Sequence, residues 1–151
     1  MRYFLDTEFN SFGGDLISLA LVPEYGDQEF YAVLPLPDRI HPWVVRNVLP
    51  YLASVPPGLA CDPAPRGTVA TQVARYLASD PEPVIVADWP EDIAHFCNLL
   101  VTGPGQMPPV GTLGFHFIAS PGFSTAENSR VPHNALHDAR ALRAFVLGGQ
   151  L

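Results

Sequence analysis

Short apolar segments separated by polar turns occupy the N-terminal part of the chain. Residues 2–5 are mostly aromatic and aliphatic, and two further largely apolar segments, 16–21 and 29–34, follow turns rich in glycine, asparagine, glutamate and aspartate. Segments of this length and composition, bounded by turn residues, are typical of β-strands. We therefore expect three strands that form an antiparallel meander.

Apolar residues at helical spacing predict four helices in the rest of the chain. The first covers 42–52, where Pro50 should end or kink it, and the second begins after Thr68, a residue type that caps helix N-termini. The third begins at Pro90, and the last covers about 133–146. These positions place the helices after the meander rather than within it.

Two short apolar segments, 83–88 and 113–118, lie between the later helices and predict two more strands. Strands that alternate with helices usually pair in parallel, because the helix carries the chain back across the sheet. The pattern as a whole predicts an α/β fold with a mixed central sheet, in which the antiparallel meander joins parallel strands and helices flank both. In such sheets, ligands gather at the carboxyl ends of the strands.

Length and composition indicate one compact domain over residues 1–151. The chain is 48% hydrophobic, which is enough for a substantial core, and its longest apolar run, 16–22, is far too short to cross a membrane. Cys61 and Cys97 are far apart and lack the spacing of a disulfide framework or a zinc site. No secretory segment is recognisable at the start, so we expect a cytoplasmic protein without membrane contact.

The charge balance limits how this chain could bind nucleic acid. Its formal net charge is −7, and all eight basic residues other than histidine are arginines. A broad basic surface of the kind that grips a phosphate backbone is therefore excluded. Any contact with nucleic acid must be local.

Asp6 and Glu8 follow the first apolar segment directly and are separated by one residue. If the strand continues through them, both side chains point to the same face, and at about 4 Å their charges repel by roughly 1 kcal/mol in water and by more where solvent is excluded. An arginine, a shared proton or a bound cation could compensate them. Two solvated acids at a strand end are the plain alternative.

Other acids occupy comparable positions along the chain. Asp88 ends the predicted strand at 83–88, and Asp92 begins the helix after it. Asp138 falls in the first turns of the last helix, and His133 precedes it by five residues. Five residues correspond to about 140° around an ideal helix, so His133 belongs on the loop that enters the helix, from which it could reach a site that Asp138 helps to build.

These segments resemble, in the same order, the three motifs of the DEDDh superfamily of 3′-to-5′ exonucleases, which have a ribonuclease H-like fold. They are Phe4-Leu5-Asp6-Thr7-Glu8-Phe9, the aspartate after the strand near the middle, and His133 followed by Asp138-Ala139. The segment at 43–50 is similar to one in small single-domain bacterial exoribonucleases of that superfamily. The middle motif is one residue shorter than usual; Asp92 fits it best and Asp88 is the alternative. Asn134, where a sister group has tyrosine, favours the histidine branch.

The resemblance implies a site and a reaction. Two divalent cations, Mg²⁺ or Mn²⁺, would be held by Asp6, Glu8, Asp92 and Asp138, and His133 would be the general base toward a water. The substrate would contact Thr7, Glu8, Phe9, Phe12 and Arg130. Phe9 and Phe12 are placed to stack on terminal bases, although both could equally be core aromatics, and Arg130 could be an ordinary exposed loop residue.

The implied function is metal-dependent 3′-to-5′ exoribonuclease activity on single-stranded RNA ends, with DNA as a second substrate class. Small catalytic domains of this superfamily often pair, so a homodimer is also implied. Two alternatives stay open. One is a ribonuclease H-like endonuclease, and the other is a catalytically silent domain of the same fold that binds nucleic acid or protein.

Overall fold

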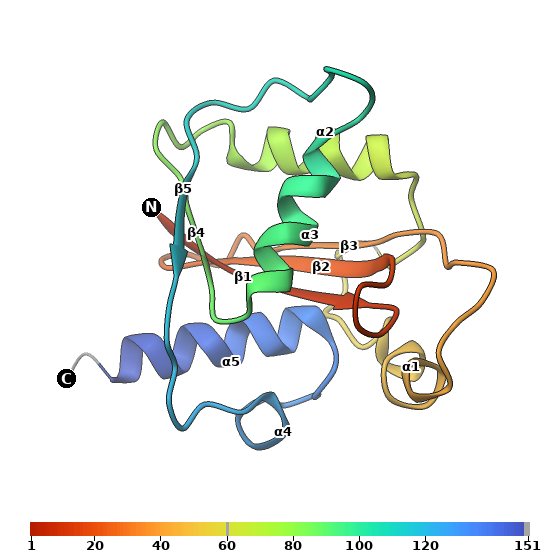
Figure 1. The fold of residues 1–151 in the computed structure, drawn as a ribbon. Helices are drawn as coiled ribbons and strands as arrows, with labels where there is room; N and C mark the ends of the chain where they lie inside the picture. Colours follow the sequence, from red (N-terminus) through yellow and green to blue (C-terminus); the bar gives the residue numbers. More distant parts are fainter. Residues whose placement is uncertain (60, 150–151) are drawn as a thin grey trace.

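The computed structural model describes residues 1–59 and 61–149 and has a five-stranded mixed sheet at its centre (Figure 1). The strands are β1 (Arg2–Phe9), β2 (Leu16–Pro23), β3 (Phe30–Val33), β4 (Val84–Ala87) and β5 (Gly114–Phe117). Their order across the sheet is β3-β2-β1-β4-β5. The first three are antiparallel neighbours, whereas β4 and β5 run parallel to β1. The expected α/β fold, with a meander joined to parallel strands, is confirmed.

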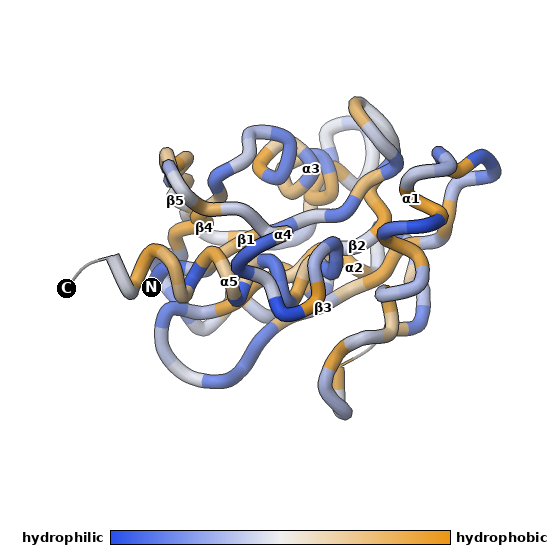
Figure 2. Tube along the Cα trace, turned by 90° about the horizontal axis from the view of Figure 1, so that it is seen from below, coloured by the Kyte–Doolittle hydropathy of each residue, from blue (hydrophilic) through white to orange (hydrophobic). Residues whose placement is uncertain are grey.

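Helices cover both faces of the sheet (Figure 1). The long ones are α2 (Arg66–Leu77), α3 (Pro90–Leu100) and α5 (Ala135–Gly148), and the short ones are α1 (Pro42–Asn47), the 3-10 turn η1 (Leu49–Tyr51) and α4 (Thr125–Asn128). Figure 1 shows α2 and α3 on one side of the sheet and α5 on the other. Hydrophobic and hydrophilic residues alternate along α5 in Figure 2, as expected for a helix with one face on a sheet.

Each face of the sheet has its own apolar core. Tyr3 and Leu5 of β1 pack toward α2 and α3, whereas Phe4 packs toward α5. Successive side chains of a strand point to opposite faces, so β1 contributes to both layers. The same alternation, continued past Leu5, decides which layer Asp6 and Thr7 face.

Three predicted helix limits change in the structure. The helix expected over 42–52 ends at Asn47 and continues as the 3-10 turn that contains Pro50, as the missing N–H of proline requires. The second helix begins at Arg66, so Thr68 is not its N-cap; the Pro65 carbonyl already accepts the Val69 N–H at 3.0 Å.

The last helix begins at Ala135 rather than near 133. Asn134 is its N-cap, because its side-chain oxygen accepts the N–H groups of Leu136 and His137. His133 therefore lies on the preceding loop, as predicted from its spacing to Asp138. Within residues 1–59 and 61–149, we find no helix whose length and apolar character would let it cross a membrane.

Candidate active site

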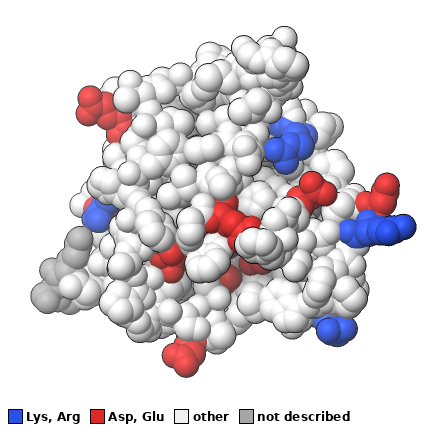
Figure 3. All heavy atoms as spheres, viewed as in Figure 1, with Lys and Arg blue, Asp and Glu red and all other residues white. Residues whose placement is uncertain are grey.

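A cleft of about 660 Å³ opens at the carboxyl ends of β1 and β4. Six carboxylates line it, from β1, from the end of β4, from the start of α3 and from α5: Asp6, Glu8, Asp88, Glu91, Asp92 and Asp138. In Figure 3, acidic side chains gather near the middle of this face, and arginines lie toward its edges. His133 is the one basic group among the described lining residues, so the cleft itself is strongly acidic.

The carboxylates reach the cleft from both layers of the fold. Asp6 and Glu8 follow Phe4 in alternation, so they share its face of the sheet, toward α5. Thr7 faces the other layer, where its N–H and hydroxyl donate to Oδ1 of Asp92 at 3.1 and 2.6 Å. Asp92 and Asp138 therefore approach the end of β1 from opposite sides.

Asp92 is held in a buried position by β1. Only 3% of its surface is exposed, and burial raises its pKa from the ordinary 3.8 to about 7, although the two bonds from Thr7 act in the opposite direction. The nearby Asp88 raises the pKa further. Asp92 thus resists ionisation unless positive charge enters the cleft.

Asp138 and His133 are tied together by the chain between them. The backbone N–H of His133 donates to Oδ2 of Asp138 at 3.0 Å, and His133 has a left-handed backbone with φ of 65°. Burial raises the pKa of Asp138 to about 6 and lowers that of His133. The ring of His133 lies edge to face with Trp43, with centroids 4.8 Å apart. The imidazole is therefore neutral near pH 7 and is positioned from two sides.

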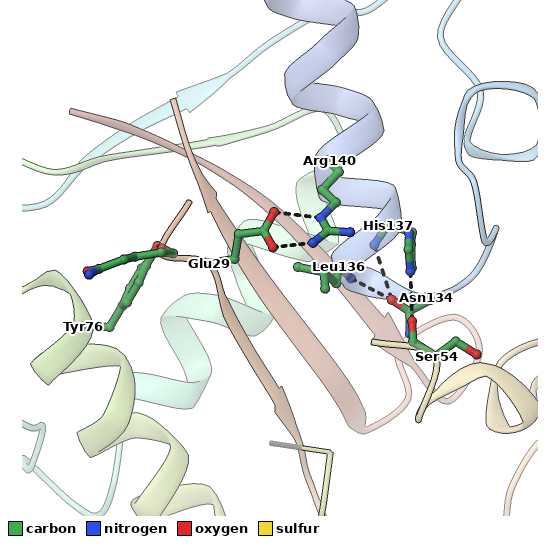
Figure 4. Close-up of polar contacts among 8 residues, drawn as sticks. Glu29, Ser54, Tyr76, Asn134, Leu136, His137 and Arg140 are labelled. Carbon is green, nitrogen blue, oxygen red and sulfur yellow. Dashed lines mark hydrogen bonds and ion pairs between the residues drawn. The ribbon is translucent and has the colours of Figure 1, made fainter. Parts of the chain in front are cut away.

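A polar network fixes the start of α5, which carries Asp138 (Figure 4). Besides capping the helix, the Asn134 side chain donates to the Tyr51 carbonyl at 2.8 Å, and a ring nitrogen of His137 lies 2.9 Å from the Ser54 carbonyl. These contacts anchor the helix to the segment after α1. They set where Asp138 stands relative to β1.

Two arginines hold the same helix against the β2–β3 hairpin. Arg140 makes a two-bonded ion pair with Glu29, visible in Figure 4, and Arg143 donates to the Glu24 carbonyl at 3.0 Å. Both side chains are used in tertiary contacts. They do not line the cleft.

The charges of the other acids in the cleft also act on Asp6 and Glu8. Loss of solvent raises the pKa of Asp6 well above its ordinary value, and the charges of Asp92 and Glu8 raise it further; burial and Asp138 do the same to Glu8. Oδ2 of Asp6 and Oδ1 of Asp138 are buried without a hydrogen-bond partner among the described residues. Unpaired buried oxygens of this kind normally need an explanation, and cations are one.

Aromatic side chains form the rim of the cleft. Phe12 is 92% exposed, and Trp43 and Trp89 are also exposed. Phe9 is half-buried and lies over the His95 ring, with centroids 4.6 Å apart. Phe12 is therefore not a core aromatic, whereas Phe9 both packs inside and lines the cleft.

The turn after β1 places Phe12 at this rim. At Gly14 a Cβ atom would lie 1.9 Å from the Asn10 carbonyl oxygen, so only glycine fits there. The Gly13 N–H donates to Oε1 of Glu91 at 3.0 Å, which joins the turn to α3. The turn that carries Phe12 is thus tied to α3 just after Phe12.

Of the remaining predicted site residues, two line the cleft and one does not. Asp88 is half-buried at the end of β4, where Oδ2 accepts the Ser120 hydroxyl at 2.8 Å. Thr7 lines the cleft, and its polar atoms bind Asp92. Arg130 is exposed and is not among the residues that line the cleft.

Sequence reasoning missed eight of the residues that line the cleft, and three of them are aromatic or charged residues near the acids. Trp43, Trp89 and Glu91 reach the cleft, and the Trp89 indole N–H lies 3.2 Å from Oε2 of Glu91. Trp89 follows Asp88 at a strand end, so its position could have suggested the site. The resemblance includes the segment 43–50 but gives Trp43 no role, and only the fold brings Trp43 against His133.

Comparison with known proteins does not assign this chain to a family. No protein-family model matches the chain, and no curated protein matches it. The class of site is therefore argued from its geometry.

Proposed function

We propose that this chain is a metal-dependent 3′-to-5′ exoribonuclease with a ribonuclease H-like fold. The strand order β3-β2-β1-β4-β5, antiparallel in the first three strands and parallel in the last two, supports this fold. The central strand β1 supplies two acids at its carboxyl end, where ligands of such sheets bind.

The observation that carries the proposal is the convergence of carboxylates from distant parts of the chain. Asp6, Glu8, Asp92 and Asp138 line one cleft together with His133, although up to 132 positions separate them. The unpaired oxygens of Asp6 and Asp138 and the raised pKa values fit residues that hold cations rather than residues paired within the protein. Carboxylate oxygens are the preferred ligands of Mg²⁺ and Mn²⁺.

In this proposal Asp6, Glu8, Asp92 and Asp138 hold two divalent cations, with Asp88 as the alternative to Asp92. When bound, the cations supply the positive charge that draws the scissile phosphate into the cleft and offsets the charge that develops during hydrolysis. The protein contributes no arginine to the described lining, so the phosphate has no other strong attractor there.

His133 acts on the attacking water. Burial lowers its pKa, so a ring nitrogen is free near neutral pH to accept the proton as water adds to phosphorus. The bond from phosphorus to the 3′ oxygen of the preceding nucleotide then breaks, which releases the terminal nucleotide. The contact with Trp43 and the backbone bond to Asp138 keep the imidazole at this position.

The aromatic rim would receive the terminal bases of a single strand. Phe12, Trp43 and Trp89 offer exposed ring faces around the acids, and stacking is worth about 1–3 kcal/mol per base. A single-stranded RNA end fits this arrangement, because unpaired bases can turn toward the rings. The homodimer stays a prediction, which light scattering on the purified chain would test.

The test uses a single-stranded RNA labelled at its 5′ end. We expect successive loss of single nucleotides with Mg²⁺ or Mn²⁺ and none with a chelator. Internal cuts would instead indicate an endonuclease, and binding without any metal-dependent turnover would indicate a silent domain. Asp6→Asn should abolish turnover while circular dichroism stays unchanged, and Asp62→Asn, an exposed acid outside the cleft, is the matched control.

A further inference from the structure

Glu8, His133 and Asp138 form a compact group with a composition different from the all-carboxylate set. One ligand atom from each lies within 4.8 Å of the others, and no other group of three histidine, cysteine or acidic residues within residues 1–59 and 61–149 meets this criterion. The three come from β1, from the loop before α5 and from α5 itself. The fold therefore brings one nitrogen and two oxygen donors to a single point.

A second observation is that part of this donor set makes no hydrogen bond within the described part of the chain. Asp138 is 2% exposed, and its Oδ2 accepts the His133 N–H. Its buried Oδ1 forms no hydrogen bond among the described residues, although the nearby Ser129 hydroxyl lowers the pKa of this carboxyl. The carboxylate of Glu8, also buried, accepts no hydrogen bond from the described part of the chain. Both acids line the cleft in which an ion would lie.

The donor set selects a different class of ion from Mg²⁺. Imidazole nitrogen is a poor ligand for Mg²⁺, which requires near-octahedral oxygen coordination, whereas a histidine with two carboxylates suits Zn²⁺. Three protein ligands with a fourth position open to solvent is a common arrangement for zinc outside structural sites. The group has that number of ligands and lies in an open cleft.

To bind Zn²⁺, the three ligand atoms need to move only slightly closer together. Bonds of about 2.0–2.2 Å in a tetrahedral site put ligand atoms roughly 3.4 Å apart, so atoms now up to 4.8 Å apart must approach by about 1.4 Å. The His133 backbone N–H already donates to the Asp138 carboxylate, which holds these two residues together.

We propose that Glu8, His133 and Asp138 bind one Zn²⁺ ion and that this ion inhibits the chain by occupying the ring nitrogen of His133. The inhibitory part rests on the proposed nuclease function, because it assumes that the free imidazole takes a proton from water. The binding part does not. A cell that supplies Mg²⁺ in excess would leave the enzyme active until Zn²⁺ rises.

The binding test uses metal-free full-length chain titrated with Zn²⁺ in excess Mg²⁺ by calorimetry, and with Co²⁺ as a spectroscopic probe of a nitrogen ligand. His133→Asn is the main variant, because asparagine tolerates the left-handed backbone at this position. We expect one Zn²⁺ per chain, weakened by more than about 100-fold in His133→Asn, since loss of a ligand should exceed the 10–100-fold cost of losing an outer-shell partner. His116→Ala, an exposed histidine outside the cleft, should bind as the parent does.

The outcomes separate this site from the proposed function. Zn²⁺ binding that is unchanged in His133→Asn, with circular dichroism intact, would overturn the site even if RNA is degraded. Loss of binding in that variant supports the site even if the parent degrades no RNA, in which case only the nuclease proposal fails. In an active parent and in His116→Ala, Zn²⁺ should stop Mg²⁺-dependent turnover at the concentration at which it binds; full activity at saturating Zn²⁺ would overturn the inhibitory part.

Discussion

Replacing Asp92 with asparagine should make the metal-free protein more stable at alkaline pH. The pKa of Asp92 rises from 3.8 to about 7 on folding, and one pKa unit corresponds to about 1.4 kcal/mol, so ionising this carboxyl in the folded chain costs roughly 4 kcal/mol. Asparagine keeps an oxygen that can accept both bonds from Thr7 and removes the charge. We expect Asp92→Asn to gain roughly 2–4 kcal/mol at pH 8, less whatever its buried amide N–H groups cost.

The sign of the pH dependence follows from the two pKa values. The folded carboxyl keeps its proton up to about pH 7, and the unfolded one loses it near pH 4, so the free energy of unfolding of the parent falls as the pH rises between these values. Below this window Asp92 is neutral in both states, and the parent and the variant should be nearly equal. In Asp92→Asn, the free energy of unfolding should fall much less between pH 4 and pH 7.

The assay is urea unfolding in a chelator at pH 4.5 and pH 8, with Asp62→Asn as the control for loss of one surface charge. The expected result is a stability difference between Asp92→Asn and the parent that is several-fold larger at pH 8 than at pH 4.5, where only the first part of the decline has occurred, together with loss of metal-dependent turnover. Equal differences at the two pH values would refute the reasoning, because they would mean that Asp92 ionises in the fold without cost.

Three further predictions concern the metal, the rim and the start of α5. Mn²⁺ at 100 times its Kd should raise the Tm of the protein by about 5–10 °C at pH 8. The rise should be much smaller at pH 5, because protons compete with the metal for the carboxylates. Differential scanning calorimetry in chelator and in Mn²⁺ measures both values. Phe12→Ala should keep the free energy of unfolding within about 0.5 kcal/mol of the parent's, because Phe12 is exposed. It should lower kcat/KM on single-stranded RNA by about 5- to 150-fold, the value of one stacked base. An unchanged kcat/KM would refute the stacking role. Asn134→Ala should cost roughly 2–3 kcal/mol in urea unfolding, because it removes a helix cap and leaves the Tyr51 carbonyl without its donor; a loss below about 0.5 kcal/mol would show that the network of Figure 4 contributes little.

Much of the candidate site could be predicted because its key residues follow local rules. The spacing of Asp6 and Glu8 puts both on one face of a strand, and the structure shows them there. The 140° between His133 and Asp138 placed the histidine on a loop, where it lies. These inferences need only the repeat of a strand or a helix, which each short segment carries by itself.

The contacts between distant segments could not be predicted. Thr7 was expected to meet substrate, yet its hydroxyl and N–H are bound to Asp92, 85 positions away. Trp43 lies against His133 only because α1 is folded beside the start of α5. The wrong prediction of Thr68 as a helix N-cap has a similar origin. A residue type that caps helices is present at this position, but the helix begins earlier, with the Val69 N–H donating to the Pro65 carbonyl.

The sequence alone determined the order and kind of the strands and the long helices, though not the short α4 or the 3-10 turn. It also determined that several acids would stand at strand and helix ends, because side-chain periodicity and turn chemistry act over a few residues. Only the tertiary structure decided that Asp92 and Asp138 approach β1 from opposite layers, that one oxygen of Asp6 and one of Asp138 stay unpaired among the described residues, and that Glu8, His133 and Asp138 meet within 4.8 Å. Those features depend on how helices pack across a sheet, and packing depends on the shapes of side chains from the whole chain at once.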